Sequence, residues 1–281
     1  MKPLFINFNG DIIPADSKVL TITNRSFRYG DGVFESMRLL KGKLQFADLH
    51  ADRLQAGMKA LKIEGYSQMD DWFLKEKTYD LAIRNKIKDG RLRLTVFRDS
   101  DGLYTPESNK AAFCLELNPM PESRYELNSR GLIMEIYNEL PKPVNALANL
   151  KTCNALVYVL AGIYKSQNKL DDAFIINQDG FLCESISSNL FVWYQDQLYT
   201  PGLSEGCVSG VMRKVVMELA VKLGIPVIEA QINPNILYEA EEVFLTNATR
   251  GIQWVMGFGV KRYFNKLSKQ LSDELNKNTQ G

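Results

Sequence analysis

Two polar side chains, Lys151 and Glu184, lie in sequence surroundings that favour chemistry at a carbonyl group. Lys151 precedes an apolar run with helical spacing, and Glu184 follows a short hairpin predicted at Asp179 and Gly180. A primary amine can attack an aldehyde and then carry protons, and a carboxylate can keep a nearby ring nitrogen protonated. These are the two polar groups that pyridoxal 5'-phosphate (PLP) requires, although a lysine such as Lys151, taken alone, is far more often a solvated side chain.

Two stretches in the second half of the chain could bind the phosphate of such a cofactor. Residues 204–213 lead into a predicted helix that we expect Ser209 to cap and Gly224 to end. Free amides and the positive end of the dipole at a helix start favour anions, although an ordinary capped helix is the alternative. The second stretch is a polar strand-exit loop, which consists of Asn247, Ala248 and Thr249.

Arg53 is a further candidate for binding an anion. The pattern predicts a helix over residues 49–63, with Asp48 as its N-cap and an apolar stripe made by Leu54, Met58 and Leu61. Arg53 lies at the edge of that stripe, so its side chain could bind the anion or simply extend past the core to solvent. The only histidine, His50, could be an ordinary residue of the first helical turn, so we expect lysine, a carboxylate or tyrosine to transfer protons.

Composition excludes several classes of protein. The chain has 281 residues, of which 45% are hydrophobic and 24% charged, as in globular proteins with a real core. Its formal net charge of +1 provides no general basic field for nucleic acid or acidic membranes. The four cysteines form no C-x-x-C pair, which argues against a zinc site and a disulfide framework. Because residues 1–10 lack an apolar signal region and no apolar run approaches ~18 residues, we expect a cytoplasmic protein without a metal or a membrane span.

A Pro-rich segment at residues 119–123 follows a strand-like stretch and is the best candidate for an interdomain linker. We predict an α/β (α+β) fold with a small N-terminal α/β domain over residues 1–118, a linker over 119–129 and a larger C-terminal domain over 130–281. In the helix after Lys151, the apolar spacing predicts a buried face. That face consists of Leu156, Val159, Leu160 and Ile163.

Taken together and in this order, these stretches resemble the class IV (fold type IV) PLP-dependent enzymes, which include branched-chain and D-amino-acid aminotransferases and 4-amino-4-deoxychorismate lyase. The resemblance runs from residues 28–35 (RYGDGVFE) to residues 246–249 (TNAT). Its most specific part is residues 151–154 (KTCN), followed by residues 184–191 (ESISSNLF) and residues 206–213 (GCVSGVMR). The resemblance implies a two-domain fold with a β-barrel-like core in the larger domain, and a homodimer.

The resemblance also implies a role for each matching residue. Lys151 is similar to the Schiff-base lysine, which also acts as the catalytic acid and base, and Glu184 to the partner of the pyridine nitrogen. Arg53, within a His-x-x-Arg-Leu pattern, is similar to the arginine that binds phosphate, and Tyr29 to a residue that lines the substrate pocket. The other implied phosphate ligands are Gly210, Val211, Asn247, Ala248 and Thr249.

The motifs resemble the lyases more than the aminotransferases. Residues 210–213 read GVMR, as in lyases, where aminotransferases usually have GITR, and residues 247–248 read Asn-Ala rather than Ser/Gly-Thr. The resemblance therefore implies release of pyruvate and 4-aminobenzoate, a folate precursor, from 4-amino-4-deoxychorismate. The alternative is a class IV aminotransferase acting on branched-chain or D-amino acids, and a protein that binds PLP without turnover is a third interpretation.

Two departures from the family patterns concern substrate and cofactor contacts. Ala155 follows Asn154, where branched-chain enzymes often have a tyrosine that contacts the phenolic oxygen of the cofactor. The loop that begins at Arg98 lacks a second arginine that several relatives have, so Arg98 and Arg38 are the remaining candidates for binding a substrate carboxylate.

Overall fold

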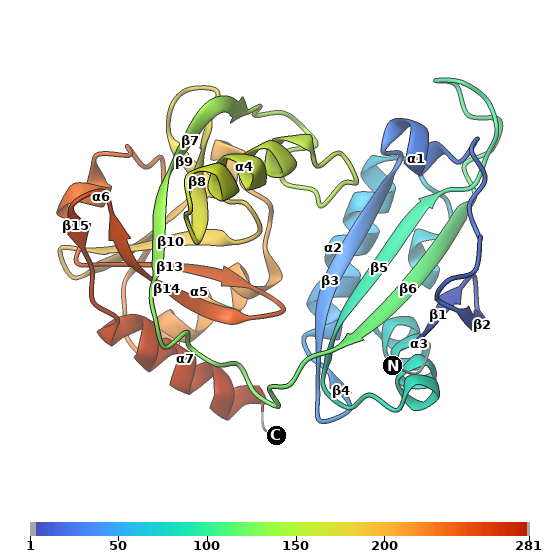
Figure 1. Ribbon diagram of the computed structural model, residues 1–281, viewed down its shortest axis with the longest axis horizontal. Coiled ribbons are helices and arrows are strands. Elements are labelled where there is room, and N and C mark those ends of the chain that lie inside the picture. Colours follow the sequence, from blue (N-terminus) through green and yellow to red (C-terminus); the bar gives the residue numbers. More distant parts are fainter. Residues whose placement is uncertain (1–3, 280–281) are drawn as a thin grey trace. The chain divides into compact units, whose positions relative to one another are not determined.

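The computed structural model describes residues 4–279, so the first three residues of the N-terminal stretch considered above lie outside it. The chain divides into two compact units (Figure 1). Unit 1 comprises Met1–Ser123 and Leu150–Asn154, and unit 2 comprises Arg124–Asn149 and Ala155–Gly281. The short segment around Lys151 therefore groups with the N-terminal unit, whereas the predicted boundaries placed it in the C-terminal domain. The amide of Phe34 donates to the carbonyl of Lys151 at 2.9 Å, which attaches this segment to unit 1.

Unit 1 contains a six-stranded antiparallel sheet with the order β2-β1-β6-β5-β3-β4. Antiparallel pairing connects β3 to β5 and β5 to β6. Of these two pairs only β5 and β6 follow each other along the chain, because β4 and two helices lie between β3 and β5. The strands are β1 (Phe5–Phe8), β2 (Asp11–Pro14), β3 (Gly32–Leu40), β4 (Lys43–Leu44), β5 (Gly90–Arg98) and β6 (Ala111–Pro119). A short helix, α1 (Arg25–Tyr29), precedes β3, and a 3-10 turn, η1 (Tyr66–Gln68), precedes α3.

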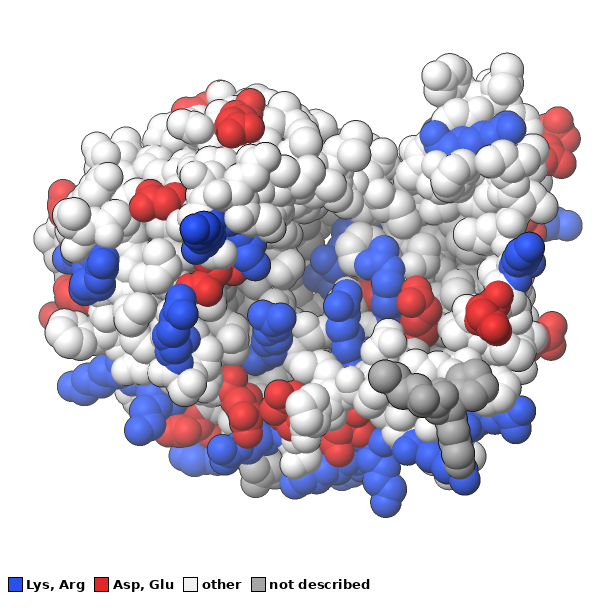
Figure 2. All heavy atoms as spheres, viewed as in Figure 1, with Lys and Arg blue, Asp and Glu red and all other residues white. Residues whose placement is uncertain are grey.

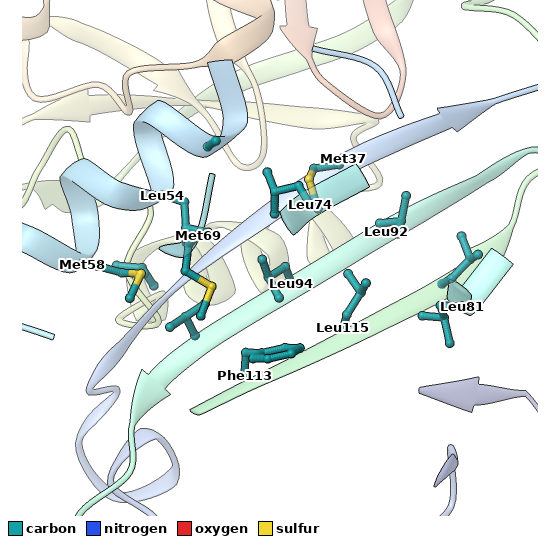
Figure 3. Close-up of a cluster of buried hydrophobic side chains, with 14 of the residues drawn as sticks. Met37, Leu54, Met58, Met69, Leu74, Leu81, Leu92, Leu94, Phe113 and Leu115 are labelled. Atoms are coloured by element: carbon teal, nitrogen blue, oxygen red, sulfur yellow. The ribbon is translucent and has the colours of Figure 1, made fainter. Parts of the chain in front are cut away.

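Helices α2 (Ala47–Ala60) and α3 (Asp71–Asn85) pack against one face of this sheet, as Figure 3 shows for their buried apolar side chains. Leu54 and Met58 from α2 and Leu74 and Leu81 from α3 meet inward-facing residues of β3, β5 and β6. The α2 stripe is thus largely as predicted, but its N-cap is not. Phe46 holds the cap position with a φ of 53°, and Asp48 lies in the first turn, where its charge still favours the helix dipole.

Unit 2 contains a nine-stranded sheet. Eight of its strands follow the order β12-β11-β10-β13-β14-β7-β8-β9, and the ninth, β15, pairs with β14. The amide of Leu182 in β9 donates to the carbonyl of Ile232, just beyond β12, at 2.9 Å, so the two ends of the sheet approach each other. The predicted barrel-like core is therefore present, filled by residues such as Phe174, Leu190 and Val243. The strands are β7 (Leu132–Lys142), β8 (Asp172–Asn177), β9 (Leu182–Ser185), β10 (Asn189–Tyr194), β11 (Gln197–Pro201), β12 (Val227–Ala230), β13 (Glu242–Asn247), β14 (Gly251–Phe258) and β15 (Lys261–Arg262).

The helices of unit 2 are α4 (Leu156–Gln167), α5 (Val211–Lys222), α6 (Ile236–Glu239) and α7 (Lys266–Thr279), with a 3-10 turn η2 (Leu203–Glu205) before α5. Gly210 is the N-cap of α5, so the prediction of Ser209 as the cap is wrong. Gly224, with a φ of 74°, follows the end of this helix as expected, because glycine adopts the left-handed conformation without strain.

The predicted buried face of α4 is exposed in the structure. Leu156 is 74% exposed and Ile163 48%, with Val159 and Leu160 also exposed. The helix packs against β7 and β8 through Val157, Tyr158 and Ala161 instead. The prediction of the buried face is therefore wrong, because apolar spacing alone selected the face that is exposed within this chain and not the face that packs against β7 and β8.

On the face shown in Figure 2, basic and acidic side chains are interspersed with uncharged residues, in keeping with the net charge of +1. Within residues 4–279, none of the helices has both the length and the apolar character needed to cross a membrane.

Candidate functional site

Lys151 is held beside β3 by backbone hydrogen bonds and a cation–π contact. Thr152 pairs with Val33 as an isolated bridge, which fixes the backbone on both sides of Thr152, directly after Lys151. The Lys151 Nζ lies 4.4 Å from the ring centroid of Phe34, and the guanidinium of Arg93 lies 3.8 Å from the same centroid. Burial lowers the pKa of Arg93. Two cations therefore share one aromatic ring, and the amine has a defined place in unit 1.

A buried charged cluster joins the same strand to α2, with Glu35 on β3 and His50 and Arg53 on α2. Arg53 donates from Nε to Glu35 Oε1 at 2.8 Å and from Nη2 to Oε2 at 2.5 Å, and His50 Nδ1 lies 2.7 Å from Oε2. Burial alone would raise the pKa of Glu35, but Arg53 and the hydrogen bond from His50 lower it to about 2. The Arg53 fork is thus fixed by a bidentate carboxylate in the core.

His50 supports this cluster rather than titrating in it. Burial lowers its pKa, against the opposing effect of Glu35, so the imidazole is neutral near pH 7 and donates from Nδ1. Its Nε2 is buried and has no hydrogen-bond partner within the described part of the chain. Glu35 was missed in the sequence, although its alternation with Val33 and Met37 in a strand indicated an inward-facing carboxylate.

In unit 2, Glu184 is buried and bound by three donors. Tyr158 donates its hydroxyl to Oε1 at 2.8 Å, Lys142 Nζ forms an ion pair with the same oxygen, and the amide of Val208 donates to Oε2 at 3.0 Å. Burial and the neighbouring Glu184 charge raise the pKa of Tyr158 well above its usual value, so it remains a donor. Neither Lys142 nor Tyr158 was identified from the sequence. Each lies far from Glu184 along the chain, and no motif marks it.

The structure brings the two predicted phosphate-binding stretches of unit 2 to one place. Asn189 pairs with Thr246 across β10 and β13, and its Nδ2 donates to the carbonyl of Val208 at 2.8 Å, just before α5. The strand-exit loop after Thr246 and the start of α5 therefore both lie next to Asn189. A Cβ added to Gly210 would lie 1.8 Å from Asn189 Oδ1, so this close approach requires glycine.

This region fits an anionic group such as a phosphate. The N-cap residue of α5 is Gly210, which has no side chain with which to cap the helix, and the hydroxyl of Thr246 is buried without a partner in residues 4–279. Asn247 shapes the adjoining loop, because its Oδ1 accepts from the amides of Thr249 at 3.1 Å and Arg250 at 2.9 Å. Ala248 lies between Asn247 and Thr249, and its carbonyl accepts a hydrogen bond from the Tyr125 hydroxyl at 3.1 Å.

Arg98, a candidate for substrate binding, uses all five of its N–H donors within unit 1. Nε and Nη2 donate to the Asp31 carboxylate, and the remaining donors reach the carbonyls of Leu61 and Lys62 and the side chain of Asn109. Burial alone would raise the pKa of Asp31, but Arg98 and Arg25 lower it. The geometry therefore favours a structural role, since a substrate carboxylate would have to displace an existing partner.

The other two candidates for substrate binding differ in exposure. The side chain of Arg38 is fully buried and donates to Met120 and to the carbonyl of Glu122, so its contacts favour holding the segment after β6. Tyr29 is half-buried at the end of α1, and its ring lies 5.4 Å from that of Tyr104. Tyr29 thus presents part of an aromatic surface to solvent.

Comparisons with known proteins agree with this fold. A branched-chain-amino-acid aminotransferase of Methanocaldococcus jannaschii, so named provisionally, is 30% identical over 277 residues, covering 96% of this chain and 93% of that protein. The aminodeoxychorismate lyase of Vibrio harveyi is 28% identical over 263 residues, covering 90% of this chain and 94% of that protein. The branched-chain amino acid aminotransferase of Thermobaculum terrenum, solved in its PLP form, matches with a TM-score of 0.87 at 20% identity, covering 98% of this chain and 94% of that one.

These matches confirm the predicted fold class, and the names of the two sequence relatives divide between lyase and aminotransferase. The family model for amino-transferase class IV matches residues 32–256, which include Lys151, Glu184 and both stretches around Asn189. The chain belongs to the class IV aminotransferase family of enzymes.

Proposed function

We propose that this protein is a PLP-dependent 4-amino-4-deoxychorismate lyase that releases pyruvate and 4-aminobenzoate for folate synthesis. The observation that carries the choice of substrate is the saturation of Arg98. An aminotransferase that acts on branched-chain or D-amino acids must bind a carboxylate on the same carbon that bears the reacting amine. The amine-bearing carbon of 4-amino-4-deoxychorismate carries no carboxylate, so this substrate does not need an arginine at that position.

PLP, when bound, supplies an aldehyde for the substrate amine and a ring that accepts electrons from the adjoining carbon. The start of α5 at Gly210 and Val211, the loop of Asn247, Ala248 and Thr249, and Arg53 would hold the phosphate. Within unit 2 the fit rests on the Thr246 hydroxyl, which has no partner among residues 4–279, and on the glycine that begins α5, and within unit 1 it rests on the Arg53–Glu35 pair.

In the reaction, Lys151 would hold the aldehyde by its Nζ before substrate arrives and then take the proton from the carbon that bears the amine. The cation–π contact with Phe34 holds this amine next to β3. The Glu184 carboxylate would accept a hydrogen bond from the ring nitrogen and so keep that nitrogen protonated. Tyr29 would contact the substrate through its exposed ring edge.

A direct experiment tests the choice of reaction. Purified enzyme loaded with PLP is incubated with freshly prepared 4-amino-4-deoxychorismate, and pyruvate and 4-aminobenzoate are measured in parallel. Equal amounts of both, absent with Lys151→Ala, support the lyase. No release, together with transfer of amino groups from members of an amino-acid panel, would contradict it.

Aminotransferase activity on branched-chain or D-amino acids is the second candidate. It is supported by the 30% identical relative that is provisionally named as a branched-chain-amino-acid aminotransferase. The same assay separates the two, because only an aminotransferase converts a keto acid acceptor into an amino acid.

We also infer that the protein acts as a cytoplasmic homodimer. The apolar face of α4 supports the dimer, because Leu156, Val159, Leu160 and Ile163 are exposed on one side of a helix that is buried on the other. A second copy of the chain is the occupant we propose for this face. A monomer at micromolar concentration in light scattering would contradict this inference.

A further inference from the structure

The contact between Lys142 and Glu184 is unusual because both side chains are almost fully buried. The side chain of Lys142 is 8% exposed and that of Glu184 4%, and they form an ion pair. Lys142 also donates from Nζ to the carbonyl of Ala148 at 3.1 Å. Lysine is rarely buried without a specific partner, because removing an ammonium group from water is costly.

Strand pairing places these two residues together. Lys142 is the last residue of β7 and pairs with Asn177 in β8, and Ile175 in β8 pairs with Glu184 in β9. The two charged residues therefore lie on strands that flank β8. The ammonium also lies 5.4 Å from the ring centroid of Tyr158, whose hydroxyl donates to the same Glu184 oxygen.

Lys142 is a cation in direct contact with Glu184, and the tyrosine and the thiols around this pair are neutral. Tyr158 is neutral because its pKa is raised by burial and by Glu184. Burial likewise raises the pKa of Cys207 to about 12 and that of Cys183 well above its usual value, so both neighbouring thiols are neutral. The remaining charged neighbours are Glu205, which adds negative charge near Cys183, and Arg213, which adds positive charge near Cys207.

We propose that Lys142 is a built-in counter-ion that competes with the protonated ring nitrogen of PLP for Glu184. This inference rests on the proposed role of Glu184 as the partner of that nitrogen. A carboxylate stabilises a proton on the ring, whereas an ammonium beside the carboxylate opposes a second positive charge there. Lys142 is thus a positioning residue that limits how strongly Glu184 stabilises the proton on the ring nitrogen. In the enzyme without cofactor, its positive charge balances the negative charge of the buried Glu184.

Replacement of Lys142 by Met distinguishes this account from simple packing. Without cofactor, Lys142→Met leaves the Glu184 carboxylate buried without its counter-ion, so we expect a lower melting temperature. With cofactor, the ring nitrogen no longer competes with a cation, so the pH at which it loses its proton should rise by about one unit. A purely structural lysine would instead lower that pH, because a poorly positioned Glu184 holds the ring proton less well.

Three variants serve as controls. Lys142→Arg keeps the charge and should leave the titration of the ring nitrogen close to that of the unaltered protein. Tyr158→Phe removes a neutral hydrogen-bond donor and should not raise the pH at which the ring nitrogen loses its proton. The double variant Lys142→Met with Glu184→Gln removes both charges, so it should melt higher than Lys142→Met alone and remains testable where the single variant fails to fold.

The experiment follows the ring nitrogen directly, by nitrogen NMR of the protein loaded with ring-labelled PLP across a pH series, together with melting curves of the apo protein. A raised ring titration in Lys142→Met and recovery of stability in the double variant are the expected results. An unchanged or lowered titration, or a double variant as unstable as the single one, would overturn the proposal. Failure of the unaltered protein to bind PLP would instead contradict the proposed function, and the apo melting curves would still test the ion pair.

Discussion

Glu35 and Arg53 form a two-pronged ion pair inside the core of unit 1, with hydrogen bonds of 2.8 and 2.5 Å. Glu35 is 1% exposed, and it also accepts a hydrogen bond from His50. The Glu35 carboxylate on β3 thus fixes the guanidinium of Arg53 on α2. In the proposed function, this pair would present Arg53 to the phosphate of PLP in a fixed position.

We predict that Glu35→Gln weakens PLP binding without abolishing it. The neutral amide cannot form the charge-assisted hydrogen bonds that hold Arg53 in place, so we expect cofactor affinity to fall by ~10-fold or more. Titration of the apo protein with PLP measures this change. The exposed Glu64 offers a matched control, since Glu64→Gln removes the same charge from a surface position of unit 1 and should leave affinity unchanged.

Glu35 also predicts a specific acid dependence of stability. Its pKa is lowered to about 2 in the folded protein, so its contribution is present above the unfolded value of 4.5 and is lost as the pH falls toward 2. A shift of this size corresponds to about 3 kcal/mol in the free energy of unfolding. Denaturant unfolding at pH 7 and pH 3 should show the difference between the unaltered protein and Glu35→Gln shrinking with acid. A constant difference would contradict this assignment.

For Lys151→Ala we predict that PLP binds but forms no covalent link to the protein. The phosphate contacts remain in this variant, whereas the amine that attacks the aldehyde is gone. Borohydride reduction followed by mass spectrometry of the peptides locates the link in the unaltered protein. The exposed Lys88 provides the control variant Lys88→Ala, and retention of a link in Lys151→Ala would show that another lysine performs this role.

Arg98→Lys tests whether Arg98 is structural. A lysine cannot reproduce five hydrogen bonds spread over a planar fork, so we predict a loss of about 2–4 kcal/mol in the free energy of unfolding. The KM of the folded fraction should change little, because Arg98 has no donor left for substrate. A large rise in KM with unchanged stability would favour the substrate-binding role inferred from the sequence.

Leu160→Glu should convert the protein to a monomer. A charge in the middle of the apolar face of α4 would have to be buried in the proposed dimer, at a cost of several kcal/mol. Light scattering after gel filtration measures the mass. Val260→Glu is the control, because Val260 is 93% exposed in the turn between β14 and β15 and adds the same charge elsewhere. Dimers of unchanged stability in Leu160→Glu would assign the exposed face to another partner.

Local sequence patterns predicted the elements well, because hairpin turns and helical stripes depend on residues close in sequence. The hairpin at Asp179 and Gly180 and the stripe of α2 are examples. The partners of the two central carboxylates could not be predicted in this way. Lys142 is 42 positions from Glu184 and Tyr158 is 26, so only the order of strands brings them together.

The roles of arginines were the least predictable part of the candidate site. Arg98 and Arg38 are ordinary cations in the sequence, and their hydrogen-bond partners come from distant segments such as the loop that contributes Asn109 to Arg98 and the segment that contributes Met120 to Arg38. The face of α4 shows a similar limit. Periodicity places Leu156 and Ile163 on one apolar face, but it does not say whether that face packs inside this chain or against another molecule.

The most direct test of the central claim is the amount of pyruvate and 4-aminobenzoate that the PLP-loaded protein releases from 4-amino-4-deoxychorismate. The account predicts equal amounts of both products over many turnovers, and none above background with Lys151→Ala. Absence of both products from a protein that carries PLP on Lys151, with amino groups transferred from an amino acid instead, would contradict the lyase assignment and identify an aminotransferase.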